Sequence, residues 1–169
     1  MILLKFEIFG NQDDPLGNPI PYTRTTARAK FRLRTKAGRP TQYARYVAFK
    51  SHILRSLSRE DERHLIQEIW PLIAAERYQF FLDCQIQFRG TRYGDVDNIM
   101  KGLLDALFPP KRKKGHSGPG DALLRGRPVT VRDGQDCGWM KCVLLGPFPR
   151  DEWPKVPIHI YEELDAHVK

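Results

Sequence analysis

The chain has 169 residues and a formal net charge of +8 at pH 7, with 28 Lys and Arg residues against 20 Asp and Glu. This length suits a single domain over residues 1–169, and no apolar run is long enough to cross a membrane. Lys5 and Glu7 interrupt the first apolar residues, which argues against an export signal and predicts a cytoplasmic protein without membrane contact.

The first part of the chain predicts a strand, a loop and a helix, in that order. Residues 2–9 alternate between apolar and polar side chains, which is the period of a half-buried strand. Residues 15–40 are rich in Gly, Pro, Thr and cations without a steady period, which indicates a long basic loop. Thr41 is a suitable N-cap for a helix over residues 42–57, with apolar positions at Tyr43, Val47, Ile53, Leu54 and Leu57.

The middle of the chain predicts a helix, a strand and a further helix. The first begins near Ser58 with acids in its first turn, and we expect Pro71 to stop or kink it. Residues 78–88 form the clearest predicted strand, because every second residue from Phe80 is apolar. From Asn98 the period is helical, with one apolar stripe made of Ile99, Met100, Leu103, Leu104 and Leu107.

The last part predicts a loop followed by β-structure. Residues 109–127 have the Lys, Arg, Gly and Pro content of a flexible basic insertion. Residues 128–135 are typical of a strand that runs into an Asp-Gly turn, with residues 139–145 as the returning strand of a hairpin. Residues 156–161 alternate once more and predict an edge strand. The whole pattern predicts an α+β fold, with a small mixed β-sheet flanked by helices in a single compact domain.

Cations are concentrated in one stretch of the chain. From Pro15 to Arg59 there are eleven Lys or Arg residues and no Asp or Glu. Counterion release makes a phosphate backbone the natural partner of such a stretch, and aromatic residues lie among the cations. The alternative is a solvated basic face, or an arm that contacts acidic protein. The candidate DNA-binding residues are Arg24, Arg28, Lys30, Arg32, Arg34, Lys36 and Arg39.

An acidic cluster stands out in "RYGDVDNIMKGLLDAL", residues 92–107. In an extended segment Asp95 and Asp97 project to the same side, and two like charges this close need a partner. Mg²⁺ is the usual one, because one or two carboxylates, phosphate oxygens and waters complete its octahedron. The structural alternative is that Asp97 caps the following helix, which explains Asp97 but not Asp95.

A lysine and a further acid extend this cluster. Lys101, one turn into the predicted helix, lies within reach of a metal-bound phosphate, and its structural alternative is an ion pair with Asp97 or Asp105. Acids, a metal and a lysine on a basic surface favour metal-assisted phosphodiester hydrolysis. Asp133 offers a third carboxylate, although Asp133-Gly134 is also a standard hairpin turn pair. The nearby alternatives for this carboxylate are Asp136 and Asp121.

A resemblance to a known family rests on these residues. The pattern Asp-x-Asp-Asn-x-x-Lys-x-x-x-Asp-Ala-Leu resembles the signature of the RusA family of Holliday junction resolvases, and it is formed here by Asp95, Asp97, Asn98, Lys101, Asp105, Ala106 and Leu107. "PIPYTR" at residues 19–24 and "TQYARYVAFKSHI" at residues 41–53 are similar to that family's basic stretch and first helix. The resemblance is close over residues 94–107 and loose over most of the remaining chain.

The resemblance implies a RusA-like fold and a specific activity. Members of the family are homodimers that nick four-way DNA junctions symmetrically, in recombination and repair, with Mg²⁺ and with Mn²⁺ as a possible substitute. By this comparison Asp95, Asp97 and Asp133 bind the metal and Lys101 assists catalysis. Asp133 matches the second aspartate of the family's Asp-Asp-x-Gln segment, and Arg132 stands where the first would be.

Two other functions are compatible with the same residues. One is a non-catalytic basic DNA-binding module in which the acids only cap a helix. The other is a metal-dependent nucleotide-sugar transferase, in which an Asp-x-Asp motif holds a metal-bound diphosphate. The long basic stretch suits a polymer better than a small sugar donor, which favours the nuclease.

Overall fold

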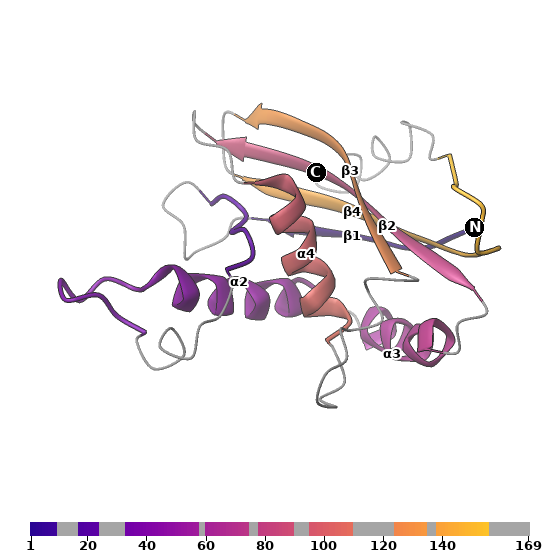
Figure 1. Cartoon of the computed structure of the whole chain (residues 1–169), viewed down its shortest axis with the longest axis horizontal. Coiled ribbons are helices and arrows are strands. Elements are labelled where there is room, and N and C mark those ends of the chain that lie inside the picture. Colours follow the sequence, from indigo (N-terminus) through magenta and orange to yellow (C-terminus); the bar gives the residue numbers. More distant parts are fainter. Residues whose placement is uncertain are drawn as a thin grey trace.

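The computed structural model describes residues 1–9, 17–23, 33–57, 60–74, 78–89, 95–109, 124–134 and 138–155. This part of the chain forms three helices and four strands (Figure 1). In order they are β1 (Ile2–Phe9), α2 (Gln42–Ser56), α3 (Glu60–Ala74), β2 (Gln79–Arg89), α4 (Val96–Leu107), β3 (Leu124–Gly134) and β4 (Trp139–Phe148). The predicted α+β class with a small mixed sheet is confirmed.

The four strands form one sheet in the order β1-β4-β2-β3. β4 runs antiparallel to both of its neighbours, whereas β2 and β3 are parallel. Parallel neighbours need a crossover connection, and α4 lies in the connection between them. The carboxyl ends of β2 and β3 and the amino end of α4 therefore lie toward the same edge of the sheet (Figure 1).

The predicted hairpin between residues 128–135 and 139–145 is wrong. β3 pairs with β2, with Phe88 opposite Asp133, while β4 lies between β1 and β2. An Asp-Gly pair is only a local turn signal, and it carries no information about which strand has a free edge to accept a partner. Leu124 pairs with Phe80, so the last four residues of the predicted 109–127 insertion belong to β3.

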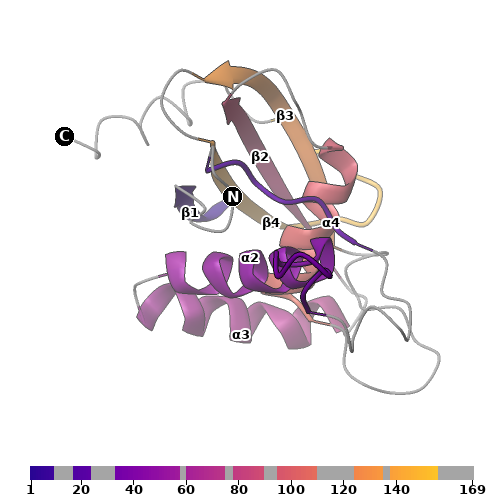
Figure 2. The ribbon, with the colours of Figure 1, turned by 90° about the vertical axis from the view of Figure 1, so that its left-hand side faces the viewer.

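All three helices cover the same face of the sheet (Figure 2). Between the helices and the sheet lies the main core, to which β2 contributes Phe80, Leu82, Cys84, Ile86 and Phe88, all fully buried. This is the apolar face that alternation predicts for the strand. The opposite face of the sheet carries a smaller apolar cluster around Phe81, which packs edge-on against Phe148 and Trp153.

The two amino-terminal helices differ from expectation in detail. α2 begins after Thr41, whose hydroxyl accepts a hydrogen bond from the Ala44 N–H at 3.2 Å, so the predicted cap is confirmed. Its buried side chains are Tyr46, Phe49 and Ile53, whereas Val47 and Leu54 are exposed. The Tyr46 ring lies against Gly102 of α4, where a Cβ would be 3.1 Å from it, and the buried face of α2 therefore differs from the predicted one.

Pro71 does not end α3, which continues to Ala74. The proline removes one backbone donor, but the last turn remains anchored because Ile69 and Ile73 are buried in the core. In the described helices, no segment is long and apolar enough to cross a membrane. The predicted edge strand at residues 156–161 lies outside the described residues.

Candidate metal and nucleic-acid site

The candidate site is at the edge of the sheet where the two parallel strands end. β2 ends at Arg89, and α4 begins six residues after it with Asp95 as its N-cap. In the neighbouring strand, the backbones of Asp133 and Gly134 pair with Phe88 and Arg89, the last two residues of β2. The topology thus brings the carboxyl end of β3 to the same edge as the acidic start of α4.

Asp95, not Asp97, caps α4. Its backbone is extended, with φ −66° and ψ 114°, and its carbonyl accepts the first helical hydrogen bond from the Ile99 N–H at 2.9 Å. Both of its carboxylate oxygens are also engaged. Oδ1 accepts from the Asp97 N–H at 3.2 Å, and Oδ2 accepts from the Asn98 side-chain amide at 2.7 Å. The structural alternative in which Asp97 is the cap is therefore wrong, because the helix begins at Val96, two residues before the start at Asn98 that its apolar stripe predicts.

Asp97 lies in the first turn of the helix and is exposed. Among the residues that the structure describes, no hydrogen bond or ion pair engages its carboxylate. Partial positive charge at a helix amino end stabilises a carboxylate in this position. Asp95 and Asp97 thus present two solvent-facing carboxylates at one helix terminus, and one of them is free to bind a cation.

Lys101 is held against an aromatic residue from a distant segment. Its Nζ lies 5.3 Å from the centroid of the Tyr22 ring, which is within the range of a cation–π contact. The Tyr22 ring packs edge-on against Tyr46 at 5.4 Å, and the Tyr22 N–H donates to the Asn98 carbonyl at 2.9 Å. Tyr22 therefore fixes the first turns of α4 through its backbone and positions the lysine through its ring.

Tyr46 packs against the Tyr22 ring that contacts Lys101. Its hydroxyl is buried, and within the described ranges it has no hydrogen-bond partner. Burial, followed by the nearby Asp105 carboxylate, raises the pKa of Tyr46 well above its usual value. The phenol is therefore neutral at physiological pH, and it contributes shape rather than charge to the candidate site.

Asn18 links the segment 17–23 to the end of β2. Its side-chain amide donates to the Arg89 carbonyl at 3.0 Å and accepts from the Arg89 N–H at 2.7 Å. Gly138 permits this approach, because a Cβ there would lie 2.5 Å from the Asn18 Cα. Asn18 was not predicted as a site residue, since a lone asparagine in a loop carries no signal of a distant backbone partner.

The described part of the basic loop forms a tight turn before α2. The Thr35 N–H donates to the Arg39 carbonyl at 2.7 Å, and Arg34 Nη1 donates to the Gly38 carbonyl at 2.9 Å. Arg34, Lys36 and Arg39 are exposed on it. In Figure 1 this turn projects toward the side of the molecule where β2 and β3 end. Three of the candidate DNA-binding cations thus stand on an ordered scaffold.

Several predicted site residues lie outside the described residues. They are Arg24, Arg28, Lys30, Arg32, Asp121 and Asp136. For Asp133 the structure describes the backbone alone, at the end of β3. No group of three His, Cys, Asp or Glu side chains suited to a metal occurs among the residues whose side chains are described. Two carboxylates with phosphate oxygens and waters are nevertheless a sufficient ligand set for Mg²⁺.

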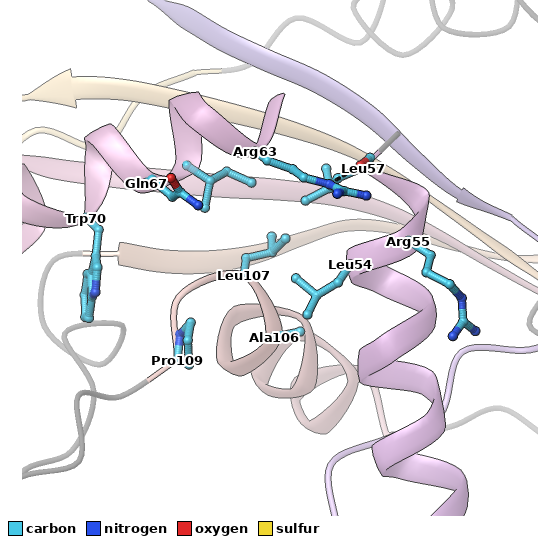
Figure 3. A pocket seen from close by; sticks show the side chains of 10 residues that line it. Leu54, Arg55, Leu57, Arg63, Gln67, Trp70, Ala106, Leu107 and Pro109 are labelled. Carbon is cyan, nitrogen blue, oxygen red and sulfur yellow. Dashed lines mark hydrogen bonds between the residues drawn. The ribbon is translucent and has the colours of Figure 1, made fainter. Parts of the chain in front are cut away.

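A pocket of about 500 Å³ lies at the opposite end of α4 (Figure 3). α4 contributes Ala106 and Leu107 to it, followed by Pro109, so it is separate from the acids at the helix start.

Comparison of the whole sequence with models of known protein families gives no match, and comparison with curated proteins gives none either. Function is therefore inferred from the residues themselves.

Proposed function

We propose that this protein is a Mg²⁺-dependent endodeoxyribonuclease that resolves four-way DNA junctions by paired nicks. The observation that carries the proposal is the placement of Asp95 and Asp97 at the start of α4, beside the end of β3 that bears Asp133. Lys101 lies one turn further along the same helix. Acids on the carboxyl edge of parallel strands and a lysine beside them form a compact set for phosphodiester chemistry.

Asp95 and Asp97 would hold the metal, with Asp133 as the third ligand. A bound Mg²⁺, or Mn²⁺ in its place, would supply Lewis-acid polarisation of the scissile phosphate and a lower pKa for an attacking water. Lys101 offsets the negative charge that develops on the phosphate in the transition state. Tyr22 keeps the ammonium group in place, because the aromatic face attracts the cation without neutralising it.

The substrate and the assembly follow from charge, symmetry and resemblance. Arg34, Lys36 and Arg39, with the other cations of the loop, bind the phosphate backbone. The preference for branched DNA, and the role in cytoplasmic recombination and repair, derive from the resemblance to RusA resolvases. The chain carries one such acidic motif, so two symmetric cuts require two copies, and a two-fold homodimer meets this need.

Cleavage of synthetic substrates tests the proposal. The wild-type protein is expected to nick four-way junctions in Mg²⁺, to leave linear duplex intact and to lose activity in chelator. Asp97→Asn should remove cleavage and leave junction binding unchanged or stronger, because it deletes a metal ligand and reduces repulsion of phosphates. Full activity of Asp133→Asn would remove Asp133 from the site and point to Asp136 or Asp121.

Light scattering tests the assembly separately from the chemistry. A homodimer should have about twice the 19.6 kDa mass of the chain at micromolar concentration. A protein that stays monomeric on junction DNA would contradict paired resolution and would leave a simple nickase.

One observation favours a second candidate function. Both carboxylate oxygens of Asp95 are engaged in capping α4. A basic DNA-binding module without chemistry would need no more than this. Such a protein would bind junctions equally well in Mg²⁺ and in chelator and would nick none of them, so the same assay separates the two functions.

A further inference from the structure

Two cysteines of the described chain face each other at the centre of the sheet. Cys84 of β2 pairs directly with Cys142 of β4, and the two sulfurs lie 3.3 Å apart. Both residues are free thiols, and both are fully buried in the main core between the sheet and the helices. The proposed nuclease chemistry uses neither of them.

The register of the two strands suits a disulfide. Residues directly opposite each other on antiparallel strands have Cα atoms about 4.5 or 5.5 Å apart, and a disulfide spans Cα separations of about 4.4–6.8 Å. The bond itself needs a sulfur–sulfur distance of about 2.0 Å, so the two thiols have to approach by about 1 Å. Because the residues are already paired in the ladder, no change of strand register is needed. The two thiols can therefore be joined within the folded sheet.

The surroundings of the pair limit which reagents can oxidise it. The next positions on the same face of the two strands are buried and apolar, and they are Leu82, Ile86, Met140 and Leu144. Burial, followed by the hydrogen bond with Cys142, raises the pKa of the Cys84 thiol. Since the thiolate is the reactive form, oxidation is slow, and local opening of the core admits a small uncharged oxidant more readily than a bulky or charged one. Hydrogen peroxide is such an oxidant.

We propose that Cys84 and Cys142 form a redox site, in which hydrogen peroxide converts the two thiols to a disulfide between β2 and β4. One sulfur attacks an oxygen of the peroxide, the O–O bond breaks, and the proton of this thiol leaves in a first water molecule. The other sulfur attacks the resulting sulfenic acid, the S–O bond breaks, and the hydroxyl leaves with the second thiol proton as another water. Two thiols are oxidised, and one peroxide is reduced to two waters.

The contact between the sulfurs determines the product of this reaction. A sulfenic acid formed on one sulfur lies beside the other thiol, so it condenses to a disulfide before a second peroxide can oxidise it further. The two cysteines are 58 positions apart in the sequence, so the bond closes a long loop in the unfolded chain and stabilises the folded one. The site does not depend on the proposed nuclease activity.

Mass spectrometry of the wild-type chain tests this proposal. The protein is treated with hydrogen peroxide at doses that leave its circular dichroism spectrum native, then denatured in a thiol-alkylating reagent and digested. We expect two peptides linked through Cys84 and Cys142, with a joint mass lower by two hydrogen atoms, which separate on reduction. Alkylated Cys84 and Cys142 at every dose, a sulfinic acid on either, or a link from either to Cys137 would overturn the proposal.

Thermal unfolding of two variants tests the effect of the bond on the sheet. Cys137→Ser removes the cysteine that lies outside the described residues and leaves only the pair. Peroxide should raise the Tm of this variant by at least about 5 °C. The double variant Cys84→Ala with Cys137→Ser receives the same dose and should show no rise, and it also controls for oxidation of the methionines. A rise in both variants, or in neither, would contradict a disulfide that joins the two strands.

Discussion

Asp95 combines a structural contact with a proposed chemical one. Its carboxylate accepts hydrogen bonds from the Asp97 N–H and the Asn98 side chain, and these bonds keep the first turn of α4 closed. The same carboxylate is a proposed metal ligand. Capping needs an acceptor atom, whereas metal binding needs a negative charge. Substitutions that remove one property without the other can therefore separate the two roles.

We predict that Asp95→Asn and Asp95→Ala both abolish cleavage but differ in stability. Asparagine caps a helix as well as aspartate does, so Asp95→Asn should keep the free energy of unfolding, whereas Asp95→Ala should lower it by about 1 kcal/mol. Urea unfolding and junction cleavage measure the two effects. An active Asp95→Asn variant would show that this residue only caps the helix.

Tyr46 gives a second prediction, which concerns pH. Burial raises its pKa, so the folded protein keeps the phenol proton at a pH where the unfolded chain releases it. The stability that this provides is complete below pH 10.0, the usual pKa of tyrosine, and is lost as the pH rises above it. The wild-type free energy of unfolding should therefore fall more steeply above pH 10.0 than that of Tyr46→Phe.

The buried hydroxyl of Tyr46 also gives a prediction for the stability of Tyr46→Phe at neutral pH. Because it is buried without a hydrogen-bond partner in the described structure, Tyr46→Phe should be as stable as the wild type or more stable by about 1 kcal/mol. Tyr43→Phe, on the same helix, serves as the control in urea unfolding at both pH values. A marked loss of stability in Tyr46→Phe at neutral pH would mean that the hydroxyl has a partner.

At the scale of the elements, the periodic segments could be predicted and their partners could not. β2 and the stripe of α4 are evident because Phe80, Leu82 and Leu103 repeat at the period of their element. The pairing of β3 was wrong, because it depends on which strand edge remains free, and this is decided by residues far away in the sequence. The start of α4 was predicted two residues too late, since both aspartates are suitable N-caps and the sequence cannot choose between them.

The site residues divide in the same way. Asp95, Asp97 and Lys101 belong to a local motif, so their proximity could be read from spacing on one helix. The contribution of residues 17–23 could not be predicted from the sequence, because Asn18 and Tyr22 reach β2 and α4 only in the folded chain. Tertiary contacts of this kind leave no periodic trace in the sequence.

The contact between segment 17–23 and α4 leads to a prediction about turnover. Tyr22→Leu removes the ring beside Lys101 and should lower the rate of junction cleavage about two- to fivefold, the size of an exposed cation–π contact. Tyr22→Phe retains the ring and should cleave at the wild-type rate. Junction affinity should be unchanged in both variants, because the backbone bond to Asn98 remains. Equal losses in the two variants would contradict a positioning role of the ring.

At the scale of the whole molecule, the net charge of +8 bears on the proposed binding to DNA. If the exposed turn before α2 contacts phosphates, log affinity falls linearly with log salt concentration. Replacing Arg34, Lys36 and Arg39 by glutamine should then flatten the slope by about 0.9 for each lost contact. Arg150→Gln, in an exposed turn after β4, is the control. An unchanged slope in the triple variant would exclude these cations from the DNA interface.

The position of β4 also determines when the sheet can assemble. β4 is the last described strand of the chain, yet it lies between β1 and β2 and pairs with both. Phe9 pairs with Trp139, so β1 gains this neighbour only after every other described strand has been synthesised. Closing such a distant contact is slow compared with forming a helix, and it leaves β1 exposed in the meantime. Until β4 has been synthesised, β1 and β2 therefore lack the strand that joins them in the sheet.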